Sequence, residues 1–356
     1  MEQPNVKSKR KSIWRKIGIG ALIAFFTFVT IIIIIAGILF YKISSPAFET
    51  DKITYLFIDE KKDYEVILSH LKTESQIKDI RLFEYLAIIM KYPKNIKTGK
   101  YEIKPQLNYI ELVRMLRNGI QSPVKLTFNN IRFKKDFAER IGNQLMFDKE
   151  TLLNNLNRQE VCQSLGFDTI TIMCMFLPNT YEIYWTVSVN QFLERMKKEH
   201  DRFWTEERLK KARDLSLSPV EVAVLASIVE EETAEQSEFP IVAGLYINRL
   251  RKGMLLQADP TVKYAVGDFE LRRILFVHLE IDSPYNTYKN SGLPPGPIRI
   301  PSIQGIDAVL NYSHHNYLYM AAKEDFSGKH NFAVTLSEHS RNAKKYHEAL
   351  NRNNIR

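Results

Sequence analysis

The feature that most constrains this chain is a run of 25 residues without charge, residues 17–41, which reads IGIGALIAFFTFVTIIIIIAGILFY. A helix of about 20 apolar residues crosses the hydrocarbon core of a bilayer, so this run can span one with some tilt. A buried core helix seldom needs so long a run, and the apolar region of a cleaved signal peptide is only about 7–15 residues long. We therefore predict a transmembrane helix at residues 17–41, with signal cleavage as the main competing interpretation.

The tail before this run is basic. Residues 1–16 hold six lysines and arginines against one acidic residue, Glu2. Positive charge beside a span favours the cytoplasmic side, so we predict a cytoplasmic tail at 1–16 and a single-pass protein of the cell inner (plasma) membrane with residues 42–356 outside. The whole chain carries a net charge of +9, and more than half of it lies in this tail. The nearly balanced remainder has no aromatic–basic recognition motif, which argues against a nucleic-acid partner.

The part outside the membrane is long enough for more than one domain, and its pattern predicts an α+β fold. Residues 48–130 mix short strands, such as 53–58, 99–103 and 124–128, with helices near 64–71, 80–90 and 109–117. Residues 131–217 are mainly helical in pattern, with amphipathic stretches at 136–145 and 191–215. We expect these two parts to be a binding or spacer module and a connecting part, because neither contains a catalytic cluster.

The two cysteines, Cys162 and Cys174, leave two alternatives open. In an exported protein they could form a disulfide, or both could be buried free thiols. Neither has metal-ligand spacing with a histidine. The histidines His330 and His339 lack a carboxylate or cysteine at a spacing that completes a ligand set, so we predict no metal site. No glycine-rich phosphate loop occurs either, and we expect no cofactor.

Residues 218–234, SPVEVAVLASIVEEETA, have the clearest helix signature in the chain. Ser218 and Glu221 form a capping box, and Pro219 suits the first helical position. The apolar residues that follow recur at helical spacing and predict a buried stripe that includes Leu225, Ile228 and Val229. Residues 218–350 are therefore the part that we expect to be the catalytic core.

Three glutamates end this helix, and the helical phase separates them. At about 100° per residue, Glu232 continues the stripe of Leu225, Ile228 and Val229, whereas Glu230 lies nearly opposite and Glu231 lies between them. A carboxyl group in line with a buried face has its pKa raised by desolvation, which suits a general acid. The competing interpretation is an acidic triplet that only caps a solvated helix end.

The stretch from 254 to 302 is rich in turns and proline, and such ordered loops usually form a binding wall. Asp259 precedes Pro260 and is the second carboxylate candidate, with a turn cap as the alternative role. The aromatic string FLPNTYEIYW at 176–185 could stack on sugar rings or could simply pack in a core.

Taken together, these strings resemble the endolytic murein transglycosylase (YceG-like) family. The resemblance covers nearly everything after the anchor, is strongest from 218 to 350 and is loose from 48 to 130. Its motifs are ASIVEEETA (226–234), Asn248-Arg249-Leu250, LQADPTVKY (256–264), SPYNTY (283–288), GLPPGPI (292–298), YLYM (317–320) and HNF (330–332) followed by His339. Glu231 departs from the family pattern, which has lysine there; because Glu231 lies off the predicted buried face, we expect Glu231→Gln to be close to wild type.

The resemblance implies a single-pass membrane protein with a LysM-like module and a mixed α/β lytic transglycosylase domain. It implies cleavage of nascent peptidoglycan strands that leaves 1,6-anhydro-N-acetylmuramic acid ends, termination of strand elongation, and peptidoglycan synthases as possible partners. The catalytic glutamate of the family corresponds to Glu232. The predicted substrate-binding residues are Glu230 as a supporting residue, Gln257, Asp259, Tyr285, Asn286 and Tyr288.

Two other functions stay open at this point. One is a peptidoglycan hydrolase in which Asp259 activates water while Glu232 is the acid, since ordinary glycosidases need two carboxylates. The other is a non-catalytic, membrane-anchored scaffold that binds glycan. A lytic transglycosylase needs only one carboxyl group, because the C6 hydroxyl of the substrate itself attacks C1.

Overall fold

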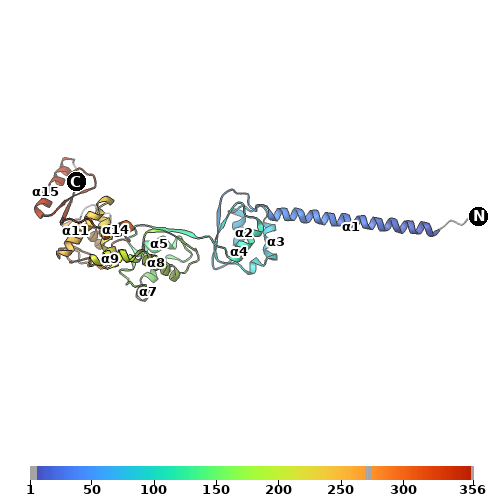
Figure 1. Cartoon of the computed structure of the whole chain (residues 1–356), viewed down its shortest axis with the longest axis horizontal. Helices are drawn as coiled ribbons and strands as arrows, with labels where there is room; N and C mark the ends of the chain where they lie inside the picture. The colour runs from blue at the N-terminus through green and yellow to red at the C-terminus, as the bar shows by residue number, and fades with distance from the viewer. Residues whose placement is uncertain (1–5, 270, 272–273, 354–356) are drawn as a thin grey trace, which may run out of the picture. The chain divides into compact units, whose positions relative to one another are not determined.

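The computed structural model describes residues 6–269, 271 and 274–353 (Figure 1). It divides into two compact units, residues 1–123 and 124–356. The fold is mixed α+β, as the sequence predicts, with one apolar N-terminal helix. Residues 1–5 of the predicted cytoplasmic tail lie outside the described residues.

Helix α1 runs without a break from Val6 to Ser44 (Figure 1). Its segment Gly20–Ser44 has a mean hydropathy of 3.0, and none of its most apolar window is buried against the rest of the chain. By length and composition this segment can cross a membrane.

The remainder of the first unit is a small α+β body. Strand β1 (Thr54–Ile58) pairs antiparallel with β2 (Gly99–Ile103), with Leu56 opposite Tyr101. Three helices accompany this pair: α2 (Tyr64–Thr73), α3 (Ile80–Ile89) and α4 (Tyr109–Asn118), with the short 3₁₀ turn η1 (Tyr92–Lys94). Their apolar faces enclose a separate core that contains Phe83, Tyr92 and Leu112. Asn108 and Glu111 form a capping box at the start of α4, and Gly119 ends the helix in the left-handed conformation.

The second unit begins one strand earlier than the sequence predicts. Strand β3 (Val124–Phe128) pairs antiparallel with β4 (Asn179–Ile183) of the second unit, so the expected boundary at residue 130 moves to residue 123. The helices around this pair are α5 (Lys134–Gly142), α6 (Lys149–Leu156), α7 (Gln159–Ser164), α8 (Val189–Phe203) and α9 (Glu206–Asp214), with the 3₁₀ turn η2 (Ile172–Met175). The single amphipathic stretch expected at 191–215 is two helices, because Thr205 caps a new start at Glu206.

Both cysteines lie in this part and are free and buried. Of the two alternatives, the structure therefore has the buried thiols. Burial raises the pKa of the Cys174 thiol, so this thiol stays protonated near neutral pH.

Helix α10 (Pro219–Glu232) contacts α9, α11, α12 and α14 of the second unit. The predicted capping box of Ser218 and Glu221 is present. All residues from Val222 to Val229 are buried, so the expectation of a single buried stripe is wrong. Ala223 and Val224 pack in the core built around β3 and β4, whereas Leu225 and Ile228 pack in the core of the following helices. A helix that is apolar all round is enclosed on every side, and this one joins the two cores of the unit.

The remaining elements of the second unit follow α10 in the chain. They are η3 (Gln236–Glu238), α11 (Phe239–Arg251), α12 (Asp259–Val266), α13 (Phe276–Leu279), α14 (Ile303–Leu310), the antiparallel pair β5 (Tyr319–Ala322) and β6 (His330–Ala333), and α15 (Leu336–Arg352). Helices α11, α12 and α14 contact α10, and the segment 254–302 between α11 and α14 is mainly loop. The residues 218–350 therefore share a core with 131–217 and do not fold as a separate body.

Candidate active site

Glu232 is the last residue of α10 and is only partly exposed. The hydroxyl of Tyr246, a buried residue of α11, donates a 2.6 Å hydrogen bond to its Oε1. Burial raises the pKa of Glu232 to about 7. The Tyr246 hydrogen bond and the charges of Arg249 and Lys263 work against this rise, while the charge of Asp259 adds to it. At neutral pH a large fraction of Glu232 thus carries the proton that a general acid needs.

Asp259 and Tyr288 interact with the charge of Glu232, and Gln257 contacts Arg249, whose charge also acts on Glu232. Asp259 is exposed at the start of α12, and its Oδ1 accepts a 2.6 Å hydrogen bond from the Tyr288 hydroxyl. Gln257 has a left-handed backbone (φ 51°), and its side-chain oxygen accepts a 2.6 Å hydrogen bond from Arg249. A non-glycine residue held in this conformation is uncommon, and such strain tends to occur at functional sites. Burial and the neighbouring Asp259 raise the pKa of Tyr288, so its phenol stays protonated.

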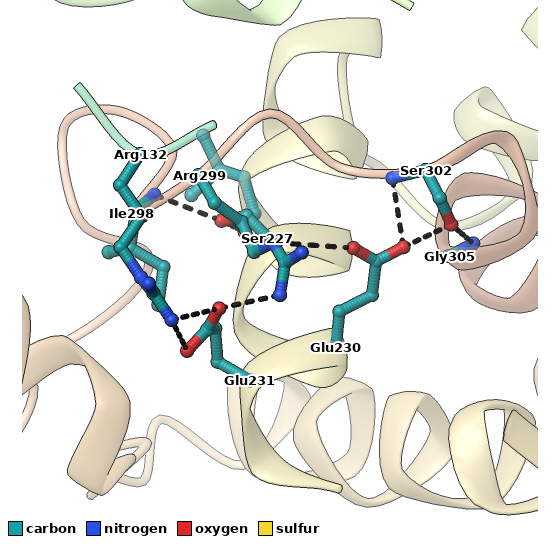
Figure 2. Close-up of polar contacts among 9 residues, drawn as sticks. Arg132, Ser227, Glu230, Glu231, Ile298, Arg299, Ser302 and Gly305 are labelled. Atoms are coloured by element: carbon teal, nitrogen blue, oxygen red, sulfur yellow. Dashed lines mark hydrogen bonds and ion pairs between the residues drawn. The ribbon is translucent and has the colours of Figure 1, made fainter. Parts of the chain in front are cut away.

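Glu230 holds the segment that leads into α14 (Figure 2). Its Oε1 accepts hydrogen bonds from the backbone N–H of Ser302, at 2.9 Å, and from the Ser302 hydroxyl. The Ser302 hydroxyl also caps α14 by accepting from Gly305 N–H at 3.0 Å. A side chain at Gly305 would overlap the Glu230 carboxylate. These contacts are internal, so Glu230 joins α10 to α14.

Glu231 is not a free surface residue. Its two carboxylate oxygens accept from Arg132 at 2.9 and 2.8 Å, and one of them also accepts from Arg299 at 2.5 Å (Figure 2). Only 16% of its side chain is exposed. The expectation that Glu231 lies off the buried face is therefore wrong. The helix is enclosed on every side, so the helical phase did not identify an exposed position.

The two other predicted residues, Tyr285 and Asn286, differ in exposure. Asn286 is completely buried; its amide donates to the carbonyls of Leu279 and Ile281 and its oxygen accepts from Tyr288 N–H. This geometry gives Asn286 a role in shaping the loop, in place of the predicted sugar contact. Tyr285 is partly exposed, lies 4.7 Å from Tyr264 between ring centroids, and lines a cavity of about 320 Å³. Other residues of this cavity are Arg132, Phe133, Ile170 and Pro297.

The aromatic string 176–185 is largely core. Phe176 is fully buried and Tyr181 nearly so, and both pack against Phe128. Ordinary packing, the simpler of the two interpretations, accounts for these rings. Tyr184 is exposed.

The described residues contain no group of three or more histidine, cysteine or acidic side chains that could hold a metal ion. The ring of His330 lies 2.8 Å from the carboxylate of Glu238, and the ring of His339 stacks on Tyr319. Each of these histidines therefore has a packing or pairing partner within the fold.

The sequence profile of the YceG-like family matches residues 56–345. This chain belongs to the YceG-like family. The curated endolytic murein transglycosylase of Bacillus subtilis (strain 168) is 28% identical to it over 338 residues, which cover 90% of this chain and 92% of that protein. The endolytic murein transglycosylase of Streptococcus pneumoniae (serotype 2, strain D39) is 25% identical over 315 residues, 80% of this chain and 57% of that longer protein. A crystal structure of a yceG-like protein from Listeria monocytogenes matches with a TM-score of 0.53 at 28% identity, covering 82% of this chain and 99% of that one.

Two residues of this YceG-like protein that interact with Glu232, Tyr246 and Arg249, were not among the site residues predicted from the sequence. They lie three residues apart on α11, so their side chains leave the same face of the helix. Arg249 belongs to the string Asn248-Arg249-Leu250, which contributed to the family resemblance but was given no role. A tyrosine and an arginine at this spacing are common in helices, so only the packing of α11 on α10 reveals their position beside Glu232.

Proposed function

We propose that this protein is an endolytic murein transglycosylase that cleaves peptidoglycan strands and leaves 1,6-anhydro-N-acetylmuramic acid ends. The observation that carries the proposal is Glu232, a half-buried carboxyl group with a pKa of about 7 beside an exposed loop wall, in a chain of the YceG-like family. The names of the relatives from Bacillus subtilis and Streptococcus pneumoniae support the same activity.

The chemistry follows from one carboxyl group acting twice. Protonated Glu232 donates its proton to the glycosidic oxygen, and the bond from C1 of the muramic acid to that oxygen breaks. The resulting Glu232 carboxylate, which accepts the Tyr246 hydrogen bond, takes the proton of the C6 hydroxyl of the same sugar. The oxygen at C6 then bonds to C1, closes the anhydro ring and leaves Glu232 protonated again. No water is consumed, and the intramolecular attack replaces an activated external nucleophile.

The wall around Glu232 supplies the substrate contacts in this proposal. Gln257, Asp259 and Tyr288 are exposed or partly exposed and bind the sugars near the scissile bond. Tyr285 stacks on a sugar in the neighbouring cavity. Glu230 and Asn286 hold the segments that carry these groups and do not contact the glycan.

The first unit places the enzyme at its substrate. In this proposal α1 anchors the chain once in the cell inner (plasma) membrane with its N-terminus in the cytoplasm, because the basic residues precede the span. The small α+β body acts as a LysM-like glycan-binding module. Nascent strands and the peptidoglycan synthases that make them would then lie on the same side as Glu232, so that cleavage terminates elongation.

Product analysis tests the proposal against hydrolysis, the alternative that the nearby carboxylate of Asp259 supports. Purified sacculi are digested with residues 42–356 in heavy-oxygen water, and the released ends are identified by mass spectrometry. Transglycosylation predicts anhydro ends without heavy oxygen. Reducing ends that contain heavy oxygen, and their loss in Asp259→Asn, would show a hydrolase. If no strand is cleaved, the remaining alternative is a non-catalytic scaffold that binds glycan.

A further inference from the structure

Arg249 is a buried cation next to the candidate acid. Only 8% of this residue is exposed. It lies one turn after Tyr246 on α11, and the hydroxyl of Tyr246 contacts Glu232. The guanidinium donates one hydrogen bond, of 2.6 Å, to Gln257, and it lies 5.6 Å over the ring of Tyr319 in β5. Residues of α11, of the loop before α12 and of β5 therefore meet at the Arg249 side chain.

The bonding of Arg249 is incomplete in the part of the chain that the structure describes. There it forms no ion pair with a carboxylate, and its enclosed Nε has no hydrogen-bond partner. A guanidinium has five N–H donors, and a buried charge is costly unless it is paired. The amide oxygen of Gln257 supplies a single neutral acceptor. Burying Arg249 at this position therefore costs free energy of folding that its contacts within the described chain do not fully offset.

A second well-enclosed arginine of this unit, Arg299, differs from Arg249 in its charged partners. Its side chain is 11% exposed and lies against the carboxylates of both Glu230 and Glu231, although its Nε, like that of Arg249, has no hydrogen-bond partner among the described residues. Arg132, which is more exposed, is also paired with Glu231. Arg299 and Arg132 thus have carboxylates within ion-pair distance, whereas Arg249 has none at that distance among the described residues and acts on Glu232 only through its charge.

A second enclosed polar atom without a hydrogen-bond partner in the described part of the chain lies on His339, which contacts Tyr319 as Arg249 does. The Nδ1 of His339, on α15, has no hydrogen-bond partner among the described residues, and its ring stacks on Tyr319 at 5.5 Å and 25°. Burial and the charge of Arg249 lower the pKa of His339, so the imidazole is neutral near pH 7. Tyr319 is thus in contact with one rich donor and one neutral imidazole, and the residue is partly exposed.

We propose that Arg249 binds an acyl carbonyl oxygen of the glycan beside the scissile bond, while the Tyr319 ring packs against the apolar part of the same group. The inference rests on the proposed transglycosylase function. The sugars of peptidoglycan strands carry two such groups, the acetamido group of each sugar and the lactyl group of muramic acid where a stem peptide is joined to it. Both present a neutral carbonyl oxygen, to which a buried guanidinium makes a charge-assisted hydrogen bond. Arg249 is then a substrate-anchoring residue that fixes the sugar ring relative to Glu232 and moves no proton.

Binding of strands to an inactive enzyme tests this role. The full-length chain in detergent carries Glu232→Gln, so that no strand is cut, and Kd is measured with and without Arg249→Gln. Three strands of equal length are compared: natural peptidoglycan, chitin oligosaccharide, which has acetamido but no lactyl groups, and de-N-acetylated peptidoglycan, which has only the lactyl groups. Loss of a charge-assisted hydrogen bond should weaken binding of the natural strand about 10- to 100-fold.

The three strands identify which carbonyl is bound. An acetamido contact predicts the same loss for chitin oligosaccharide and none for the de-N-acetylated strand, and a lactyl contact predicts the reverse. Arg251→Gln is the matched control, because Arg251 also contacts a tyrosine, Tyr312, but is exposed at the end of α11. It should leave all three Kd values unchanged.

An equal loss for all three strands, or no loss for the natural strand, would overturn the inference. Thermal unfolding checks that Arg249→Gln is folded; if it is not, Arg249→Lys, which keeps the charge but loses the planar donors, takes its place and should show the same strand dependence with a smaller loss. Failure of the proposed function would show differently: wild type would release no anhydro ends from sacculi. Wild type that releases them while Arg249→Gln binds natural strands normally rejects only the role of Arg249.

Discussion

At the residue scale, the proposed reaction depends on the protonation of Glu232. Its pKa is about 7 in the folded chain and about 4.5 in the unfolded chain, so the folded state holds more protons between these values. Stability therefore decreases as pH rises from about 4.5 to 7, and the acid step is lost as pH rises through about 7. Both effects follow from burying one carboxyl group, which is the condition that gives the site its acid.

The hydroxyl of Tyr246 should set the alkaline limit of activity. Its hydrogen bond to Glu232 stabilises the carboxylate and so lowers the pKa of that group. Tyr246→Phe should move the alkaline limb of the kcat/KM profile to higher pH. Tyr312→Phe, which removes a hydroxyl bonded to Arg251 on the exposed end of α11, should leave the limb in place. If the alkaline limb of the Tyr246→Phe profile stays at the wild-type pH or moves to lower pH, Glu232 is not the group whose pKa sets that limb.

Asn286 and Tyr288 should respond differently to substitution, although the sequence gives them the same role. Asn286→Ala removes the donors that hold Leu279 and Ile281 in a fully buried loop, so the melting temperature and the activity should fall together. An unsatisfied buried group costs about 1–3 kcal/mol. Tyr288→Phe loses only the partly exposed bond to Asp259, so activity on strands should fall while the melting temperature changes little. Unfolding curves and initial rates of the two variants decide this, and a stable Asn286→Ala with low activity would restore its predicted sugar contact.

At the element scale, the sequence predicted the start of α10 well and its surroundings poorly. The capping box of Ser218 and Glu221 is a local signal, because all its atoms lie within one turn. Which faces of the helix are buried depends on elements distant in the chain, both the earlier core around β3 and β4 and the later helices α11, α12 and α14. The phase of the three glutamates therefore gave the wrong environment to Glu231, whereas the choice of Glu232 as the acid stays a prediction.

The Glu231 cluster should contribute measurably to stability. Glu231 joins α10 to Arg132, before α5, and to Arg299, before α14. Glu231→Gln leaves two arginines without their carboxylate, and it should lower the free energy of unfolding by about 1–3 kcal/mol. Glu207→Gln removes an exposed i,i+4 pair with Lys211 and should cost less than about 1 kcal/mol. Denaturant unfolding of the two variants checks this, and equal losses would mean that the cluster is no more than a surface pair.

At the scale of the whole molecule, the proposed function gives the two units separate tasks. The charge-free run and its basic flank could be recognised from the sequence, because length and composition alone decide whether a helix can cross a membrane. The division at residue 123 was not, because β3 has the same pattern as a strand of either unit and only its pairing with β4 assigns it. Likewise Tyr246 and Arg249 reach the site only through tertiary packing.

Residues 124–356 alone should retain the chemistry. Every residue of the candidate site, from Arg132 to His339, lies in the second unit, which has its own two cores. A chain of residues 124–356 should therefore release anhydro ends from soluble strands at a rate within about tenfold of residues 42–356. It should no longer sediment with membranes, since α1 is absent. A folded but inactive fragment would show that the first unit contributes to catalysis.

The most direct test of the central claim is the rate at which Glu232→Gln forms anhydro ends, measured by mass spectrometry of products from sacculi and compared with wild type. Glutamine keeps the shape and removes the proton, so the rate should fall about 10²- to 10⁴-fold while the melting temperature and strand binding are retained. Glu230→Gln, which alters the hydrogen bond to Ser302, should leave residual anhydro product. The account is contradicted if Glu232→Gln still forms anhydro ends at near the wild-type rate while a folded Glu230→Gln forms none.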